Sequence, residues 1–368
     1  VWRGCRPVDP LTAAQREAER MEKEKKEEEK KKEVDPRIDR VVVQPGEAES
    51  ALQYVKPGHW MAASQRMRAL YLDFIGESQL SVTNSDGEIY PVDRTPYVAD
   101  ASRPVLLLKG QPKDIETTFF VPQDDKAMQV RIDMQERGFG RSVRQANPVN
   151  RMPAYQYHFV VLAREPSRYG LVKTLDSVVV PWDGETDSDD TEDPVHYRVV
   201  ALPVAPAVPI PDSPLLWTSI AYVLWDEVDP QVFTREQQRA LVDWLHWGGQ
   251  LIVSGPDSLD LLKGSFLEPY LPAANGGSRK IAAADLAEFN RSWAVGSATA
   301  RSNRLAPAKP WSGVSFQLQP GGQFVESTGE LVAERDVGRG RIVVTAMQLS
   351  ERGLGNWKGG VESWFNAA

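Results

Sequence analysis

The sequence contains very little cysteine and histidine, which excludes several kinds of site. Its 368 residues include one cysteine, Cys5, and four histidines. A single cysteine cannot form an internal disulfide framework, and it cannot supply a zinc site built from several cysteines. No histidine follows His246. A nucleophile located after this position therefore has no histidine base downstream of it in the chain.

Long apolar runs and concentrated basic charge are also missing. No stretch reaches the ~18 consecutive apolar residues that mark a membrane-spanning helix. The formal net charge is −8, and no segment concentrates the basic charge that a nucleic-acid partner requires. The chain starts at Val1 and stops inside a helix-like pattern at 360–368. We therefore expect a piece of a longer protein, whose membrane association depends on segments outside this piece.

Residues 1–37 are predicted to form a charged helical stalk or linker. Between residues 11 and 33, 16 of the 23 residues are Glu, Lys or Arg, and pairs such as Glu19 and Lys23 have the four-residue spacing that favours a helix. This helix lacks an apolar stripe, so it cannot form a coiled coil. A spacer is the preferred interpretation, and a partner-binding helix is the alternative.

Residues 38–150 are predicted to form a β-sandwich domain. The pattern consists of short strands bounded by Gly, Pro, Asn or Asp, at 41–43, 69–72, 79–83, 105–108, 117–121 and 129–133. Domains of this kind present binding surfaces. Four arginines near the end of this region are interpreted as ordinary solvated side chains, with an anion-binding patch as the alternative. They are Arg137, Arg141, Arg144 and Arg151.

Residues 151–368 are predicted to form an α/β domain with a mostly parallel sheet, centred on residues 214–263. The run 220–225 is apolar on both faces, as a strand covered by helices on each side must be. Thr234 and Gln237 have the spacing of a helix capping box. Gly248 and Gly249 end that helix, and we expect Gly249 to have the left-handed backbone. A second buried strand at 250–253 then leads into a tight turn.

The remaining pattern of the α/β domain alternates apolar strands with loops and helices. Strands are predicted at 157–162, 177–180, 196–202, 323–326, 330–334 and 341–345, helices at 168–174 and 282–289, and a loop at 273–277. His158 is expected to be a hydrogen-bonded core residue of the first strand rather than a catalytic base. The tryptophans are expected to fill the interfaces between layers, among them Trp217, Trp225, Trp244, Trp247, Trp357 and Trp364.

Seven acidic residues between Asp183 and Asp193 form an acidic insertion at 183–194. A calcium-binding EF-hand loop that began at Asp183 would need Gly at 188 and Glu at 194, where this chain has Ser188 and Pro194. A mobile acidic insertion is the preferred interpretation. The alternative is a cation or ligand sensor, for which Asp187, Asp189 and Asp190 are the candidate metal ligands.

The strand, the capped helix with Trp-x-x-Gly-Gly at its end, the next strand and the sharp Ser-Gly turn resemble the class I glutamine amidotransferase-like fold, a flavodoxin-like α/β fold. The resemblance is to non-catalytic versions in large uncharacterised bacterial envelope proteins, and it covers roughly residues 155–350. Active members carry a cysteine nucleophile on this turn and a histidine much later in the chain. Here the turn is Ser254-Gly255-Pro256 and no histidine follows. The resemblance therefore implies the fold without the catalytic residues.

The preferred function is a non-catalytic scaffold or protein-interaction module on the extracytoplasmic side of a bacterial cell envelope. We expect a protein partner and no cofactor, and no residue is assigned a catalytic role. The enzyme alternative is a serine hydrolase, whose nucleophile is Ser254 or Ser258. Its base is one of His158, His196 and His246, and Asp226 or Asp257 is the orienting acid.

Overall fold

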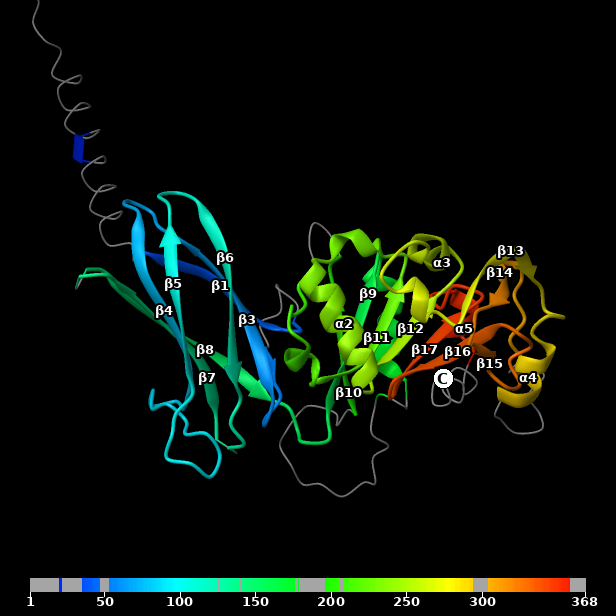
Figure 1. The fold of residues 1–368 in the computed structure, drawn as a ribbon, viewed down its shortest axis with the longest axis horizontal. Helices are drawn as coiled ribbons and strands as arrows, with labels where there is room; N and C mark the ends of the chain where they lie inside the picture. The colour runs from blue at the N-terminus through cyan, green and yellow to red at the C-terminus, as the bar shows by residue number, and fades with distance from the viewer. Residues whose placement is uncertain are drawn as a thin grey trace, which may run out of the picture.

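The chain has an all-β part and an α/β part, which confirms the expected mixture of fold classes (Figure 1). The computed structural model describes residues 20–21, 35–46, 53–124, 126–138, 140–175, 178, 196–204, 208–293 and 304–357. Of the predicted stalk helix at 11–33, only Arg20 and Met21 are among these, and both are helical. The acidic insertion at 183–194, the strand at 177–180 apart from Val178, and the pattern at 360–368 lie outside the described residues.

The all-β part consists of two sheets that face each other. Its strands are β1 (Arg37–Gln44), β2 (Tyr54–Val55), β3 (Trp60–Arg68), β4 (Phe74–Thr83), β5 (Asp100–Leu107), β6 (Pro112–Phe120), β7 (Met128–Glu136) and β8 (Ser142–Arg151). One sheet has the order β1-β3-β6 and the other the order β2-β8-β7-β4-β5. Apart from the parallel pair β2 and β8, neighbouring strands are antiparallel.

The core of the all-β part follows from alternation along its strands. In β7 the residues Met128, Val130, Ile132 and Met134 are buried, while the residues between them are half-buried. Side chains that alternate in this way bury one face of a strand and leave the other toward solvent. The predicted strand at 69–72 was wrong, because the chain bends after Ala69. Strands β3 and β8 were missed, and both are rich in polar residues that pair within a sheet.

The α/β part is built around a seven-stranded sheet. Its strands are β9 (Tyr157–Ala163), β10 (Tyr197–Leu202), β11 (Ile220–Asp226), β12 (Gln250–Ser254), β15 (Gln323–Phe324), β16 (Val332–Val337) and β17 (Gly340–Thr345). A separate antiparallel pair consists of β13 (Ala273–Ile281) and β14 (Trp311–Leu318). The helices are η1 (Pro166–Thr174), η2 (Pro214–Trp217), η3 (Pro230–Val232), α2 (Arg235–Trp247), α3 (Asp257–Leu262), η4 (Glu268–Tyr270), α4 (Ala287–Trp293) and α5 (Arg352–Gly355).

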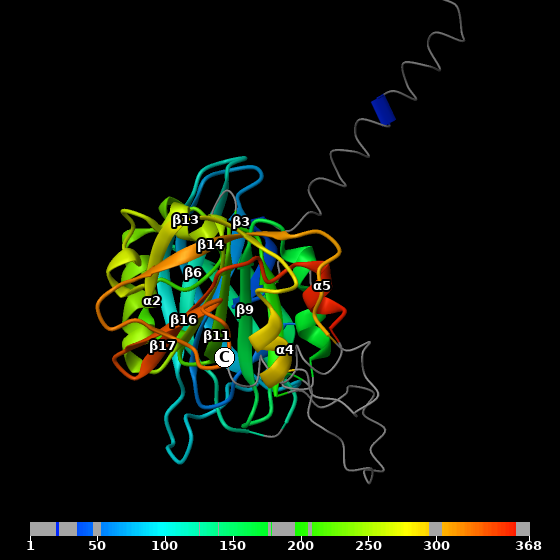
Figure 2. The same cartoon turned by 90° about the vertical axis from the view of Figure 1, so that its right-hand side faces the viewer.

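The sheet order is β10-β9-β11-β12-β17-β16-β15. The first five strands are parallel, and β16 and β15 are antiparallel additions at one edge. Parallel strands need crossover connections that cover the faces of the sheet. Figure 2 shows α2 and α5 on opposite faces of this sheet. Both faces are therefore covered, which explains why the central strands are apolar throughout.

Helix α2 begins and ends where the sequence predicts. Thr234 Oγ1 accepts a hydrogen bond from Gln237 N at 3.2 Å, and Gln237 Oε1 accepts one from Thr234 N at 3.1 Å. The end of the helix differs in one detail, because Gly248 has the positive φ of +129° and Gly249 does not. Gly249 instead lies against the Trp244 ring, with no room for a side chain.

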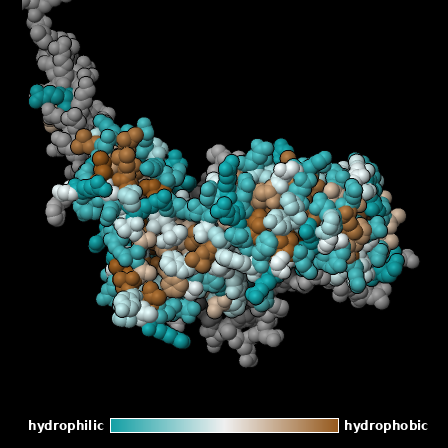
Figure 3. Space-filling model, viewed as in Figure 1, coloured by the Kyte–Doolittle hydropathy of each residue, from teal (hydrophilic) through white to brown (hydrophobic). Residues whose placement is uncertain are grey.

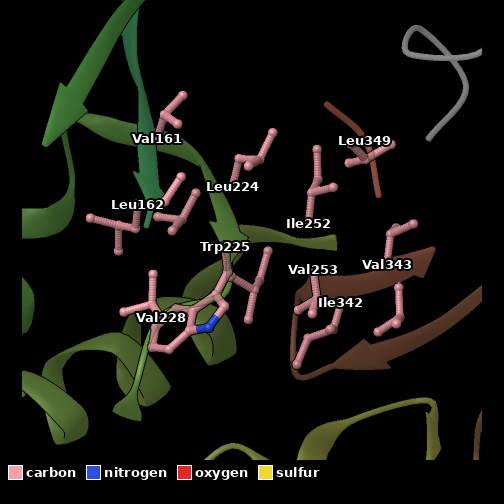
Figure 4. Close-up of a cluster of buried hydrophobic side chains, with 14 of the residues drawn as sticks. Val161, Leu162, Leu224, Trp225, Val228, Ile252, Val253, Ile342, Val343 and Leu349 are labelled. Atoms are coloured by element: carbon pink, nitrogen blue, oxygen red, sulfur yellow. The ribbon is translucent and has the colours of Figure 1, made fainter. Parts of the chain in front are cut away.

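The core of the α/β part lies between the sheet and its covering helices. Figure 4 shows Leu162, Leu224, Ile252 and Val343 on neighbouring strands, with Trp225 and Val228 packed beside them. Trp217, Trp225, Trp244 and Trp357 are buried as expected. The expectation was wrong for Trp247, which is 55% exposed at the end of α2, and Trp364 lies outside the described residues.

Two other predictions for this part need correction. The predicted loop at 273–277 is the start of β13, whose partner strand β14 lies about forty residues later in the chain. Helix α4 starts at Ala287 rather than at 282, and the predicted helix at 168–174 is the 3₁₀ helix η1, with a kink at Tyr169.

Candidate functional site

The sheet has a topological switch point at the carboxyl ends of β9 and β11. The chain passes from β9 to β10 on one side, then returns past β9 to β11, β12 and β17 on the other. In open parallel sheets, ligands bind beyond the carboxyl ends of the strands where the order reverses. Here the strand ends bring Arg164, Asp226 and Ser254 to one edge, which makes this edge the candidate site.

Ser254 is fully buried, and its hydroxyl group is already engaged. Ser254 Oγ accepts a hydrogen bond from Leu349 N at 2.9 Å and one from the Tyr169 hydroxyl at 3.1 Å. Leu349 follows β17, and Tyr169 belongs to η1 on the connection after β9. Ser254, at the end of β12, therefore links three segments of the domain by hydrogen bonds, and solvent does not reach it.

Asp226 ends β11 and is 3% exposed. Burial raises the pKa of its carboxyl group, and the Tyr169 and Ser254 hydroxyls lower that pKa in part. Asp226 Oδ2 accepts a hydrogen bond of 3.5 Å from Gln348 Nε2, and Oδ1 has no hydrogen-bond partner among the described residues. Tyr169 is affected in turn, because burial and then the charge of Asp226 raise the pKa of its phenol.

Glu227 has a left-handed backbone with φ of +52°, which is costly for a residue with a side chain. Its amide donates a hydrogen bond to Ser258 Oγ at 2.9 Å, and its Oε1 accepts one from Gln348 Nε2 at 2.9 Å. Its Oε2 lies 3.4 Å from Arg164 Nη1 in an ion pair. Ser258, the other predicted nucleophile, is thus also buried and hydrogen-bonded.

All four histidines lie at or before the amino ends of the parallel strands, opposite to Ser254. His158 is near the start of β9, His196 directly precedes β10, and His246 lies in the last turn of α2 before β12. His59, from the all-β part, has Nδ1 3.0 Å from Thr218 Oγ1, just before β11. Because the register pairs His158 with Ile220, the distance along β11 to Asp226 is about 20 Å.

The structure therefore separates the residues of the predicted hydrolase into two groups. Asp226, Ser254 and Ser258 come together at the carboxyl edge, and Asp257 follows there as the first residue of α3. None of the three candidate bases, His158, His196 and His246, is brought to this edge. His246 Nδ1 instead lies 2.8 Å from Val242 O on its own helix.

Metal ligands were predicted in the acidic insertion, and Asp187, Asp189 and Asp190 lie outside the described residues. Within the part of the chain that the structure describes, no group of three or more His, Cys, Asp or Glu residues is arranged to hold a metal ion. In the same part, every helix is too short or too polar to cross a membrane.

Sequence reasoning missed several residues of the carboxyl edge. Tyr169 and Gln348 reach it from a 3₁₀ helix and from the segment after β17, and neither carried a recognisable motif. Three of the four arginines near the end of the all-β part contact protein groups through their side chains. Arg141 binds Asp35 and Glu136, Arg144 binds Asp133, and Arg151 donates to Asp124 O.

A second group of titratable residues lies where the two parts of the chain meet. Lys56 is 1% exposed; its Nζ donates to Ala154 O at 2.6 Å and lies 4.0 Å from the centre of the Tyr157 ring. Burial lowers the pKa of Lys56 to about 8. Burial also lowers the pKa of His158 to about 3. His158 is fully buried, as expected of a core residue, and a hydrogen bond with the Ser219 backbone raises its pKa in part.

The comparisons with known proteins identify no family. No protein-family model matches the chain, and no curated protein matches it. Among solved structures, it is similar to Spo0M, a sporulation control protein from Bacillus subtilis, with 15% identity over 32% of this chain and 51% of that chain and a TM-score of 0.20. A Niemann-Pick type C2 protein from Japanese carpenter ant has 11% identity over 32% of this chain and 93% of that chain, with a TM-score of 0.24.

This chain thus spans about half the length of Spo0M. Neither structure is described as an amidotransferase, so that resemblance stays a prediction.

Proposed function

We propose that this chain is a non-catalytic scaffold or protein-interaction module of a bacterial membrane-associated protein. The observation that carries the proposal is the state of Ser254, whose buried hydroxyl accepts hydrogen bonds from Leu349 N and Tyr169. A working serine nucleophile needs a base within about 3 Å and an open approach for the substrate. The buried hydroxyl and the position of the histidines at the opposite edge both argue against that role.

The proposal includes the amidotransferase-like, flavodoxin-like fold of the α/β part. Counted in chain order, the five parallel strands have the order 2-1-3-4-5, which is the flavodoxin-like order. The turn after β12 occupies the position of the nucleophile elbow in that fold. The polar contacts of Ser254, Asp226 and Gln348 at this edge connect the ends of β11 and β12 to the segment after β17.

We also propose three units, with a stalk at 1–37, a β-sandwich domain at 38–150 and an α/β domain at 151–368. Two separate hydrophobic clusters support the division, one formed by residues between Ile38 and Val149 and the other by residues between Phe159 and Trp357. The location on the extracytoplasmic side of the envelope and the protein partner rest on the sequence resemblance alone.

The test is covalent labelling with a serine-reactive fluorophosphonate, read by mass spectrometry of the intact protein and its peptides. The full chain is expected to carry no adduct under conditions that label a known serine hydrolase to completion. Ser254→Ala and Ser258→Ala are the matched variants, because both serines are buried on the same edge. Stoichiometric labelling that Ser254→Ala abolishes and Ser258→Ala retains would refute the proposal and support the serine hydrolase.

A further inference from the structure

Two carboxylates, one from each part of the chain, come together where the all-β part meets the α/β part. Glu116 lies on β6, and Asp212 lies just before η2. The charge of Asp212 raises the pKa of Glu116, second only to burial, so the two groups are close. Strand β3 contacts η2, and Figure 1 shows β1, β3 and β6 on the side of the all-β part that faces the α/β part. Figure 3 shows the two parts in contact as space-filling bodies.

The amide group of Gln44 places an unpartnered oxygen beside Glu116. Gln44 ends β1 and is 3% exposed, and its Nε2 donates to Glu116 Oε2 at 3.1 Å. Its Oε1 has no hydrogen-bond partner among the described residues. Both side chains lie on the outer face of their sheet, because the neighbours that alternate with them, Val43 and Ile115, belong to the core of the all-β part. A buried amide oxygen without a partner is costly, so a group that binds it is expected here.

The charge at this junction is negative. Neither Glu116 nor Asp212 forms an ion pair with a described residue. Arg103 lowers the pKa of Glu116 in part, but this is the smallest effect on that carboxyl group, and the guanidinium donates to the Glu116 backbone carbonyl. Burial lowers the pKa of Lys56 and of His59 at the same junction, and neither carboxylate offsets that effect. Glu116 therefore lies in a field that attracts a cation.

The segment that carries Asp212 is held in place on its amino side. Gln237 Nε2 donates to Ile210 O at 2.8 Å, and Trp217 Nε1 donates to Pro211 O at 3.0 Å. Asp212 itself is exposed, so its carboxylate can turn toward Glu116 without a change in the backbone.

Two carboxylates and an amide oxygen are the ligands of a hard divalent cation. Ca²⁺ takes about 6–8 oxygen ligands at about 2.3–2.6 Å, from carboxylates, amide carbonyls and water, so neighbouring ligands lie about 3 Å apart. The 3.1 Å between Gln44 Nε2 and Glu116 Oε2 matches that spacing, and a half-turn of the amide places Oε1 where Nε2 now lies. Mg²⁺ demands a near-ideal octahedron, which ligands from two separate parts of the chain meet less well.

We propose that Glu116, Asp212 and the amide oxygen of Gln44 bind a divalent cation, with Ca²⁺ as the best fit. The bound cation neutralises the two carboxylates, pairs the amide oxygen and takes its remaining ligands from water. Because its ligands come from both parts of the chain, its binding joins the all-β part to the α/β part. This site is separate from the acidic insertion at 183–194, and it goes beyond the proposed function, which the labelling of Ser254 tests independently.

The experiment titrates calcium chloride into the full chain by isothermal titration calorimetry, after removal of metal with EDTA and dialysis, at pH 7 and constant ionic strength. We expect a dissociation constant of about 0.1–1 mM, the range of the weaker calcium sites in proteins. Glu116→Gln and Asp212→Asn, the junction variants, should each weaken binding about tenfold or more. Gln44→Met, which removes the amide oxygen and keeps the length of the side chain, should weaken binding less.

Thermal unfolding separates cation binding from a purely structural role. In EDTA, Glu116→Gln should unfold at the same temperature as the unmodified chain or at a higher one, because the repulsion from Asp212 is gone. In about 10 mM calcium chloride the unmodified chain should gain about 2–5 °C, while Glu116→Gln gains little. A calcium-dependent gain of the same size in both proteins would contradict the assignment.

The matched controls change acidic residues outside the junction. Asp114→Asn removes an exposed carboxylate on the same strand, which pairs with Arg66, and a triple variant removes three carboxylates of the acidic insertion, Asp187→Asn with Asp189→Asn and Asp190→Asn. Both controls should bind calcium like the unmodified chain. No calcium binding, or binding that the junction variants leave unchanged, overturns the proposal. Loss of binding in the triple variant alone also overturns it and assigns the cation to the acidic insertion.

Discussion

Lys56 is a buried lysine at the junction between the two parts of the chain, and its lowered pKa links stability to pH. Its ammonium group contacts Ala154 O and the Tyr157 ring, both from the segment that leads into β9. Burial still dominates, and it lowers the pKa of Lys56 from 10.5 to about 8. The folded protein therefore releases this proton at a lower pH than the unfolded chain does.

Stability should consequently rise with pH between about 8 and 10.5, because the unfolded state binds more protons there. Below pH 8 both states are protonated, and the folded state carries the full cost of the buried charge. Lys56→Met should raise the free energy of unfolding at neutral pH by up to about 2 kcal/mol and remove this rise. Urea unfolding across this pH range, with the exposed Lys263→Met as control, measures the difference. A difference independent of pH would contradict the assignment.

Gly249 provides a test of packing at one residue. A Cβ atom there would lie 2.2 Å from Cδ2 and Cε2 of the buried Trp244 ring, so the ring would have to move. Gly249→Ala should lower the free energy of unfolding by about 2 kcal/mol or more. Gly170→Ala is the control, because a Cβ in that 3₁₀ helix meets nothing within 4 Å and should be neutral or slightly stabilising. Equal unfolding curves for the two variants would place the Trp244 ring elsewhere.

At the scale of the element, the first turn of α2 does more than begin the helix. Gln237 closes the capping box with Thr234, and its Nε2 also donates to Val208 O and Ile210 O at 3.1 and 2.8 Å. The helix start therefore holds the connector that leads from β10 toward β11.

We predict that Thr234→Ala costs about 1 kcal/mol, the usual value for a lost cap. Gln237→Ala should cost about 2 kcal/mol, since it also leaves two carbonyl groups of the connector without a donor. Chemical denaturation of both single variants and the double variant measures the coupling. Equal costs for the two single variants would show that the connector contacts add nothing.

The elements that the sequence predicts well are those with local signals. Helix α2 has its cap, its apolar face and its glycine end within fifteen residues, so propensity and burial agree. Strand β13 contains Gly276 and Gly277 and resembles a loop, because its stability comes from pairing with β14 far along the chain. Strand β8 was missed for a similar reason, since its alternating exposed and half-buried polar residues gain order only beside β7.

At the scale of the whole molecule, the candidate edge could be predicted only in part. Asp226 and Ser254 were found because both end buried strands of the predicted sheet. Tyr169 donates a hydrogen bond to Ser254 at that edge, and Gln348 donates one to Glu227. Both residues come from distant segments, whose packing no local sequence pattern predicts. The absence of a histidine after His246 indicated the lack of a base, and the register then placed the remaining histidines at the opposite edge.

Asp35, near the end of the proposed stalk, contacts the β-sandwich: its carboxylate accepts the Leu70 amide hydrogen at 2.7 Å and pairs with Arg141. Asp35→Ala should lower the thermal midpoint by several degrees, because loss of these hydrogen bonds costs about 1–3 kcal/mol. Deleting residues 11–33 should leave the midpoint unchanged, since a charged helix without an apolar face contributes no packing. Differential scanning calorimetry compares the two. If the deletion lowers the midpoint as far as Asp35→Ala does, the charged segment must pack against the body and the spacer interpretation fails.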